Sequence, residues 1–257
     1  MSVEKIEGNK KMQKFFVEKQ QIKEDKITII GTDVNHIKNV LRYQAGDKIQ
    51  IGDKESKDTY IAIIEKCNSE EIQCKMIEKK ERNKKKEIQI DLYQGLPKAD
   101  KMEWIIQKTT ELGIASIIPV AMERSIVKIQ EKEVSKKIDR WQKIAEVAAK
   151  QSKREEIPKI HTIMNLQQVL EKIKEYDLFI TAYEEEKEKT LKQVLRELKV
   201  ENEIKIGILI GPEGGISLRE IEKLKEKQTQ IITLGDRILR TETAPIAITS
   251  MIMYELE

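Results

Sequence analysis

Two glycine-bearing loops near the C-terminal end of the chain constrain its fold most strongly. The first loop, Gly211–Ser217, follows the apolar run Ile204–Ile210, and the second, Gly235–Pro245, follows the apolar run Ile231–Leu234. Each loop joins a strand-like run to a helix-like pattern, and ligands of α/β sheets bind at the carboxyl ends of the strands. We therefore expect the two loops to form two walls of one pocket.

From Glu87 onward, strand-like runs alternate with helix-like patterns. The predicted strands are 88–93, 116–120, 177–182, 204–210 and 231–234, and the predicted helices are 100–112, 134–149, 166–173, 190 onward, 217 onward and 244–256. Capping-box pairs support three helix starts, namely Asp100 with Glu103, Thr190 with Gln193 and Ser217 with Glu220. This alternation predicts an α/β domain over 87–257, with helices on both faces of a mainly parallel sheet.

The preceding part of the chain has a different pattern. Short strand-like runs at 15–17, 27–30, 48–51, 59–64 and 72–77 are separated by turn residues, which is typical of a small β-barrel over 12–80. One exception is Asp33–Arg42, whose apolar spacing predicts a short helix with Asp33 as N-cap. We expect residues 1–11 to be a flexible leader and 81–86 a charged linker between domains.

Charge is unevenly distributed. Residues 1–86 hold 20 Lys and Arg against 15 Asp and Glu, whereas the remaining residues hold 28 against 30. A basic front end favours contact with a polyanion, and scatter in a Lys-rich chain is the alternative. Cys67 and Cys74 lack metal-ligand spacing, so two free thiols are expected and no metal site. No apolar run is long enough to span a bilayer and there is no signal-peptide core, which favours a cytoplasmic protein without membrane contact.

The two loops carry different chemistry. The first lacks the Gly-Lys-Ser/Thr ending of a phosphate-binding loop and the glycine spacing of a dinucleotide fingerprint. Its backbone groups could bind an adenine edge and ribose hydroxyls, and a tight turn before a helix is the alternative. The second loop places Arg237, Arg240, Thr241, Glu242 and Thr243 between two apolar elements. Such a set suits phosphate or nucleobase recognition, and an Arg–Glu pair that only fixes the loop is the alternative.

Both loops resemble the signatures of the RsmE family. The matching segments are LIGPEGGIS at 209–217 and LGDRILRTETAP at 234–245, with further similarity in MQKFFV at 12–17, HIKNVLR at 36–42, KMEWIIQKTTELG at 101–113, ERS at 123–125 and RWQKIAEVAAKQSKR at 140–154. Members of this family are bacterial methyltransferases that modify N3 of a uridine in small-subunit ribosomal RNA, and they belong to the SPOUT superfamily of knotted α/β methyltransferases. Residues 1–11 precede the usual start of the family, and Asp236 occupies a position expected to vary.

The resemblance implies a fold and a set of partners. It implies an N-terminal PUA-like β-barrel for RNA and a C-terminal SPOUT domain that binds S-adenosyl-L-methionine inside a trefoil knot. It also implies a homodimer with an active site built across the subunit interface, and 16S ribosomal RNA in the small subunit as substrate. Two alternatives are a SPOUT methyltransferase for another ribosomal or transfer RNA position, and a non-catalytic RNA-binding assembly protein.

The family pattern also implies roles for individual residues. Arg240 is expected to contact the uridine or its phosphate, with Glu213 and Glu242 handling the proton. Water is the alternative proton acceptor, and a loop carboxylate bonded to backbone N–H groups is the alternative role for Glu213. The residues expected to bind the cofactor are Thr181, Ala182, Leu209, Gly211, Gly215, Leu234, Gly235, Ile238, Leu239 and Thr243. The residues expected to bind RNA are Lys14, His36, Asn39, Arg42, Lys98, Lys101, Arg124 and Arg154, of which Arg124 and Arg154 could act from the partner subunit.

Overall fold

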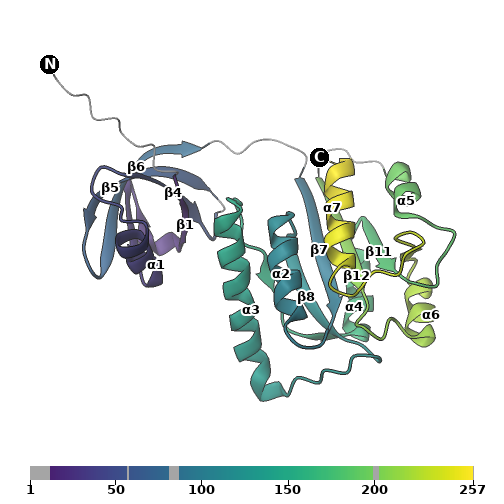
Figure 1. Cartoon of the computed structure of the whole chain (residues 1–257). Coiled ribbons are helices and arrows are strands. Elements are labelled where there is room, and N and C mark those ends of the chain that lie inside the picture. Colours follow the sequence, from purple (N-terminus) through teal and green to yellow (C-terminus); the bar gives the residue numbers. More distant parts are fainter. Residues whose placement is uncertain (1–11, 57, 81–86, 199–202, 257) are drawn as a thin grey trace. The chain divides into compact units, whose positions relative to one another are not determined.

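The chain divides into two compact units, Met1–Asn83 and Lys84–Glu257, in the computed structural model shown in Figure 1. The structure describes residues 12–56, 58–80, 87–198 and 203–256. The predicted leader, 1–11, and the predicted linker, 81–86, lie outside these ranges. The predicted domain limits therefore stay predictions, and each unit is described by itself.

The N-terminal unit is built on one curled, six-stranded sheet. Its elements are β1 (Lys14–Val17), η1 (Lys19–Gln21), β2 (Ile22–Lys23), β3 (Lys26–Ile30), α1 (Thr32–Asn35), η2 (His36–Val40), β4 (Lys48–Asp53), β5 (Thr59–Cys67) and β6 (Glu71–Lys80). The strand order is β1-β4-β5-β6-β3-β2. Only the pair β1 and β4 is parallel among the described strands of this sheet. All five strands predicted here are confirmed, whereas η1 and β2 were not predicted.

The helix predicted at Asp33–Arg42 exists, but its predicted start is wrong. The helix begins at Thr32, its N-cap is Gly31, and Asp33 lies in the first turn. Gly31 has a φ of 77°, a conformation that glycine adopts without strain, so the turn into the helix falls there. The second half of the segment, η2, is a π-helical turn, and Ile37 and Val34 pack from this segment into the core of the unit.

The C-terminal unit contains a parallel sheet in the order β10-β8-β7-β12-β11-β13, with β9 paired to β8. Its strands are β7 (Glu87–Gly95), β8 (Ser116–Ala121), β9 (Lys159–Ile160), β10 (Met164–Asn165), β11 (Leu178–Ala182), β12 (Glu203–Ile210) and β13 (Gln230–Ile232). Its helices are α2 (Lys101–Glu111), α3 (Glu131–Gln151), α4 (Leu166–Lys172), η3 (Ile173–Glu175), α5 (Leu191–Glu197), α6 (Leu218–Glu226) and α7 (Ala244–Leu256). The predicted alternation is confirmed, and among the described elements the two-residue strands β9 and β10 and the short helix η3 were not predicted.

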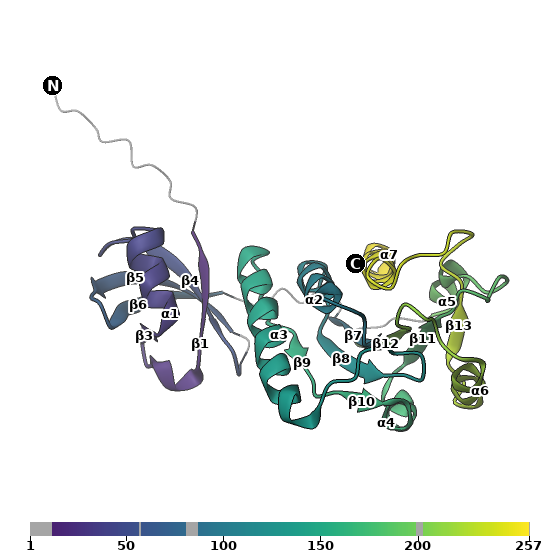
Figure 2. The same ribbon diagram turned by 60° about the horizontal axis from the view of Figure 1, so that its bottom comes forward.

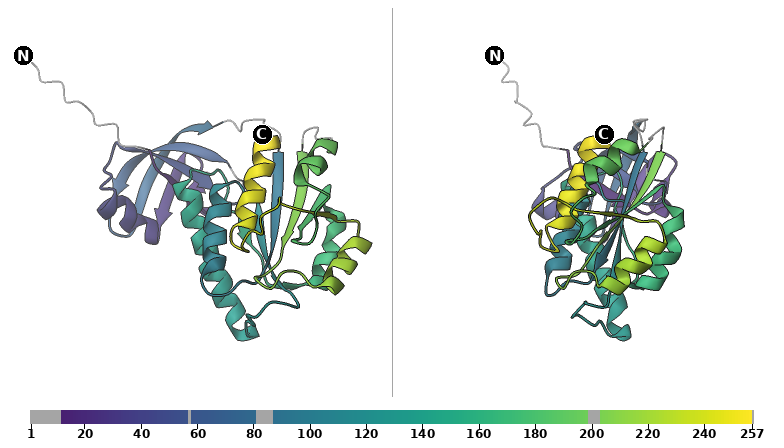
Figure 3. Two further views of the ribbon diagram at one scale, coloured as in Figure 1. Left: turned by 45° about the vertical axis from the view of Figure 1, so that its right-hand side comes forward. Right: turned by 90° about the vertical axis from the view of Figure 1, so that its right-hand side faces the viewer.

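Helices cover both faces of this sheet. In Figure 2, α2 and α7 lie on one side of the strands and α6 lies on the other, and Figure 3 shows the same layers from two further sides. The central strand β12 has apolar side chains on both faces. Ile206 and Ile208 point into the core under α2 and α7, while Leu209 points into the core under α4 and α6. Side chains alternate between the faces of a strand, so an almost wholly apolar strand supplies both cores.

Two of the three predicted capping boxes are confirmed. Thr190 accepts a hydrogen bond from the backbone of Gln193, and Ser217 accepts one from the backbone of Glu220. The prediction at Asp100 is wrong, because Asp100 is the N-cap of α2 but its side chain makes no capping hydrogen bond. Glu103 instead forms an ion pair with Arg140 of α3 at 2.7 Å. A partner distant in the sequence has replaced the local one.

Candidate active site

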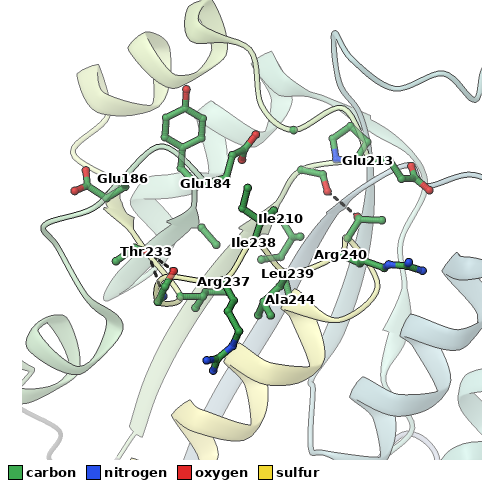
Figure 4. Close-up of a pocket in the computed structure, with 18 of the residues that line it drawn as sticks. Glu184, Glu186, Ile210, Glu213, Thr233, Arg237, Ile238, Leu239, Arg240 and Ala244 are labelled. Atoms are coloured by element: carbon green, nitrogen blue, oxygen red, sulfur yellow. Dashed lines mark hydrogen bonds between the residues drawn. The ribbon is translucent and has the colours of Figure 1, made fainter.

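A cavity of about 700 Å³ opens where β11, β12 and β13 end, as Figure 4 shows. Both glycine loops line it, as does the segment after β11. The lining residues are Lys101, Ala182, Tyr183, Glu184, Glu186, Lys187, Ile210, Gly211, Pro212, Glu213, Gly215, Thr233, Leu234, Gly235, Asp236, Arg237, Ile238, Leu239, Arg240, Thr241 and Ala244. The volume lies within the roughly 300–1,000 Å³ of small-molecule sites.

Most residues predicted to bind the cofactor line this cavity. They are Ala182, Gly211, Gly215, Leu234, Gly235, Ile238 and Leu239. Thr181 and Leu209 do not line it, because they are paired neighbours on β11 and β12 whose side chains are fully buried in the sheet. Thr243 does not line it either, and its backbone N–H donates to the carbonyl oxygen of Arg240. The pleat of the strands thus separates Ala182, which lines the cavity, from its neighbour Thr181.

The first loop is a tight turn held close to the sheet. The N–H of Gly215 donates to the carbonyl oxygen of Pro212 at 2.9 Å, and Gly215 has a φ of 70°. A Cβ atom on Gly215 would collide with Oε1 of Glu184. On the other side, a Cβ atom on Gly95, the last residue of β7, would lie 2.6 Å from the nitrogen of Pro212. Glycine is therefore required at position 95 by the close approach of backbone, whereas at position 215 it is favoured by the positive φ, since the Glu184 side chain could move aside.

A buried hydrogen bond joins the two loops. The hydroxyl of Thr241 donates to the carbonyl oxygen of Gly211 at 2.8 Å. The same hydroxyl oxygen accepts a hydrogen bond of 3.0 Å from Nε2 of Gln94, near the end of β7. The walls of the cavity are therefore tied to each other and to the sheet. The two loops predicted one pocket, but no sequence pattern predicted this hydrogen bond between them.

Lys101 lies between the two glutamates predicted to handle the proton. Its Nζ is 3.0 Å from Oε1 of Glu213 and 3.1 Å from Oε2 of Glu242. The backbone N–H of Lys98 also donates to Glu213 at 3.0 Å. Lys101 was predicted to bind RNA phosphate, but the structure places its ammonium at the rim of the cavity, where it bridges both loops.

These contacts change the ionisation of all three side chains. Hydrogen bonds to Glu213 and then to Glu242 raise the pKa of Lys101. Burial raises the pKa of Glu213, but hydrogen bonds from Lys101 and from backbone N–H groups outweigh it and leave that pKa below its ordinary value of 4.5. The pKa of Glu242 is lowered by the same balance. Both carboxylates are therefore ionised and weakly basic at neutral pH.

Arg240 lies at the edge of the cavity with its side chain 83% exposed. Its Nη1 is 4.0 Å from Oε1 of Glu242, so the Arg–Glu pair considered as an alternative is long and open to solvent. Figure 4 shows Arg240 and Arg237 extending away from Ile238 and Leu239. The guanidinium of Arg240 is thus placed to meet a molecule that approaches the mouth of the cavity.

The residues of the N-terminal unit predicted to bind RNA separate into two groups. His36, Asn39 and Arg42 are exposed around η2. The side chain of Asn39 donates to Asn35, and the ring of His36 stands edge-on to Phe15. Lys14 is different, because it is buried with its Nζ donating to Thr59 at 2.9 Å and lying over the ring of Phe16. That placement does not suit a phosphate contact.

Three further residues predicted to bind RNA lie in the C-terminal unit. Lys98 is exposed. Arg124 is exposed and its Nη1 donates to the carbonyl oxygen of Gly214 at 3.1 Å, within one subunit. Arg154 donates to three backbone carbonyl oxygens, those of Thr110, Gly113 and Ile114, where α2 ends. Burial lowers the pKa of Arg154 to about 10. The last carbonyl groups of a helix lack hydrogen-bond donors within the helix. Arg154 therefore supplies donors to the C-terminal end of α2.

The segment after β11 also belongs to the site, although the sequence did not predict it. Tyr183, Glu184, Glu186 and Lys187 all line the cavity. Glu186 accepts hydrogen bonds from three successive backbone N–H groups, so it fixes the shape of its own loop. Ligands bind at the carboxyl ends of strands in α/β sheets, and these residues follow a predicted strand, 177–182. They could therefore have been predicted in the same way as the glycine loops. Their charge and lack of glycine made them resemble a solvated turn.

Within the described ranges there is neither a metal-binding cluster nor a membrane-spanning helix. No three His, Cys, Asp or Glu side chains gather there in a way that could hold a metal ion. No helix within those ranges combines the length and apolar character needed to cross a membrane.

Comparison with known proteins identifies the class. Residues 84–253 match the family described as RNA methyltransferase domain, and residues 29–77 match the RNA methyltransferase PUA domain. The fold is similar to that of a putative methyltransferase from Legionella pneumophila in complex with S-adenosylmethionine, with a TM-score of 0.82 and 27% identity over 95% of this chain and 98% of that one. The chain is therefore an RNA methyltransferase with a PUA domain before its methyltransferase domain.

The particular family follows from closer relatives. The chain is 38% identical to ribosomal RNA small subunit methyltransferase E of Bacillus subtilis over 96% of this chain and 98% of that protein. It is also similar to the structure of the Neisseria gonorrhoeae methyltransferase E bound to S-adenosyl methionine, with a TM-score of 0.81 and 27% identity over 95% and 98% of the two chains. The chain belongs to the ribosomal RNA small subunit methyltransferase E family, as the two loops predicted.

Proposed function

We propose that this protein transfers a methyl group from S-adenosyl-L-methionine to N3 of a specific uridine in 16S ribosomal RNA of the small subunit. The observation that carries the proposal is the cavity between the two glycine loops, in a chain of this family. Two similar structures contain S-adenosylmethionine, and the cavity of about 700 Å³ has room for a ligand of that class.

The lining of the cavity fits the cofactor chemically. Backbone groups of Gly211, Gly215 and Gly235 can approach a ligand closely, and Leu234, Ile238 and Leu239 supply apolar surface for an adenine ring. The bound cofactor would supply a methyl group already activated on a sulfonium. The protein's own task is then to position the acceptor base and exclude water.

The acceptor nitrogen of a uridine carries a proton that it must lose. We assign Arg240 to stabilise the negative charge that develops on the flanking carbonyl oxygens, because its exposed guanidinium lies at the mouth of the cavity. Glu213 and Glu242 are poor general bases, since Lys101 holds both ionised with lowered pKa values. We therefore assign these two carboxylates to loop positioning and the proton to solvent.

We assign initial docking of the RNA to the PUA domain. His36, Asn39 and Arg42 are exposed around η2, and residues 1–86 carry the excess of basic side chains. Phosphate contacts of this kind position RNA without reading its sequence and are weakened by salt. Of the other residues predicted to bind RNA, Lys98 and Arg124 of the C-terminal unit are exposed and are retained as RNA contacts. Lys14 of the N-terminal unit and Lys101 and Arg154 of the C-terminal unit are not retained, because their side chains are bound within the protein.

We also propose the homodimer and the trefoil knot that the family pattern implies, in a cytoplasmic enzyme that uses no metal. Exposed apolar side chains on α2 and α7 support the dimer, since Trp104 is 51% exposed, Met251 47% and Tyr254 88%. Apolar surface of this kind often marks a protein interface. The proposal of the knot rests on the family pattern, and the buried hydrogen bond from Thr241 to Gly211 shows that the two loops that pattern involves lie against each other.

The test uses the purified protein, S-adenosylmethionine with a labelled methyl group, and small ribosomal subunits from a strain that lacks this methylation. Calorimetry is expected to give a Kd in the micromolar range, and mass spectrometry is expected to place the label on N3 of one uridine. Label on transfer RNA or on another ribosomal position would favour a different SPOUT specificity. Cofactor binding without transfer to any RNA would favour the assembly protein.

A further inference from the structure

Gln94 is a buried polar residue behind the cavity. It is the second-to-last residue of β7, it is fully buried, and it pairs in register with Ile210 of β12 and Pro119 of β8. It is not among the residues that line the cavity. A group at this position can affect a bound ligand only through the residues that hold the cavity walls.

The orientation of the Gln94 amide is fixed by its neighbours. Nε2 donates to the carbonyl oxygen of Gly95 at 3.0 Å and to Oγ1 of Thr241 at 3.0 Å. The reversed amide would place Oε1 against the carbonyl oxygen of Gly95, and two acceptors cannot form a hydrogen bond. The amide therefore presents a donor to Thr241.

That donor determines the direction of the next hydrogen bond. A threonine hydroxyl has one proton and can accept further hydrogen bonds on its oxygen. Because Thr241 accepts from Gln94, its own proton is directed to the carbonyl oxygen of Gly211 at 2.8 Å. One directional chain, from Gln94 through Thr241 to Gly211, thus joins β7, the second loop and the first loop.

We infer that Gln94 is a positioning residue that sets the affinity for the methyl donor by fixing the spacing of the two glycine loops. This inference rests on the proposed function. Backbone groups that bind a ligand do so well only when they are already held in the bound geometry. The close approach of Pro212 to Gly95 limits how far the first loop can move towards the sheet, and the chain through Thr241 limits how far it can move away.

The other end of the Gln94 amide supports a functional role. Its Oε1 is buried and has no hydrogen-bond partner in the described part of the chain. An unpartnered buried acceptor destabilises a fold, so an apolar residue of similar size would serve stability better. The presence of glutamine at this position is explained by the hydrogen bond from its Nε2 to Thr241, which holds the two loops together.

The experiment measures cofactor binding to the full chain by calorimetry, with S-adenosylmethionine and with S-adenosylhomocysteine. Gln94→Leu removes the donor and keeps the approximate volume. We expect the Kd for both ligands to rise about 10–100-fold, as expected for loss of buried hydrogen bonds, with the thermal midpoint of the ligand-free protein within a few degrees of wild type. In turnover, KM for the methyl donor should rise more than kcat falls. The matched control is Gln167→Leu on the exposed face of α4. This variant should change neither the Kd for the cofactor nor the KM for the methyl donor.

Thr241 provides an independent test if Gln94→Leu fails to fold. Thr241→Ser keeps the hydroxyl, and its Kd for the cofactor should lie within about threefold of the wild-type Kd. Thr241→Val removes the hydroxyl, and its Kd should rise about tenfold or more. In the double variant Gln94→Leu with Thr241→Val, the loss should not exceed the larger single loss, because both changes break one chain. An unchanged Kd for Gln94→Leu, additive losses in the double variant, or equal effects of Ser and Val would overturn the inference. Failure of the wild-type protein to bind S-adenosylmethionine would instead overturn the proposed function.

Discussion

Nζ of Lys101 lies 3.1 Å from Oε2 of Glu242, at the rim of the cavity and 141 positions apart in the sequence. The same ammonium is 3.0 Å from Glu213 in the other loop. One lysine at the start of α2 thus holds a carboxylate from each wall of the cavity. Two side chains that the sequence suggested for catalysis and one that it suggested for RNA binding are parts of one ion-paired cluster.

Loss of Lys101 should loosen both loops at once. In Lys101→Met, Glu213 and Glu242 would repel each other across the rim. We expect methyl transfer to fall about 10–100-fold, because a displacement of about 1 Å in the groups that position a substrate can cost about 10²-fold in rate. Hydrogen exchange of 211–217 and 235–243 should become faster. Lys98→Met is the control for the hydrogen-exchange measurement. The described hydrogen bonds of Lys98 to Glu213 use its backbone N–H, which this substitution keeps. Unchanged hydrogen exchange of both loops in Lys101→Met would show that Lys101 does not hold them in place.

The same cluster predicts how stability depends on pH. A carboxyl group with a lower pKa in the folded state than in the unfolded chain stabilises the fold above its unfolded value, and this contribution is lost as the pH falls through the folded pKa. For Glu213 and Glu242 the loss begins near the ordinary value of 4.5 and continues below it. Thermal midpoints measured from pH 7 to pH 3 should therefore fall less steeply in Lys101→Met than in wild type. Parallel curves would show that Lys101 does not set these pKa values.

Arg240 should be needed for transfer and not for cofactor binding. Arg240→Ala is expected to keep the Kd for S-adenosylmethionine and to reduce kcat about 10²–10³-fold, as expected for loss of one group that stabilises developing charge. Arg219→Ala is the matched control, because Arg219 is exposed on α6 and is not among the residues that line the cavity, and this variant should retain most of the activity. If calorimetry shows that Arg240→Ala abolishes cofactor binding while RNA binding persists, its role has been misassigned.

Gly95 should tolerate no side chain. In Gly95→Ala the new Cβ atom would meet the backbone of Pro212 at 2.6 Å, and backbone cannot move aside as a flexible side chain can. We expect a destabilisation of about 1–3 kcal/mol, measured by denaturant unfolding, together with weaker cofactor binding. Gly46→Ala, where nothing lies within 4 Å but φ is 96°, measures the cost of backbone strain alone in the other unit. Cofactor affinity should be unchanged in that control.

Arg154 should matter for stability and not for RNA. Arg154→Met removes hydrogen bonds to the carbonyl oxygens of Thr110, Gly113 and Ile114 and should cost about 2–4 kcal/mol of unfolding free energy, because hydrogen bonds from charged groups are strong and their partners would be left buried. Its affinity for ribosomal RNA, measured by filter binding at fixed salt, should equal that of wild type. Lys98→Met should show the opposite pattern, with weaker RNA binding and nearly unchanged stability, because Lys98 is exposed and its hydrogen bonds to Glu213 use the backbone N–H.

Local sequence patterns predicted most of the strands and helices and the place of the site. Apolar runs with β-branched residues gave the strands, three-to-four-residue spacing gave the helices, and the loops at 211–217 and 235–245 lay at strand ends, where they line the cavity. These properties depend on neighbours in the chain, so a local pattern records them. The resemblance to the methyltransferase E family depends on the same segments.

Only the tertiary structure decided what the charged residues do. Lys14, Lys101 and Arg154 look alike in the sequence, as basic residues near family motifs, yet one is buried against Thr59, one bridges Glu213 and Glu242, and one closes the end of α2. Gln94 and Thr241 likewise meet across 147 positions. A charge or an amide acquires its role from the partners and the burial that folding gives it, and those partners come from distant parts of the chain, where no local pattern records them.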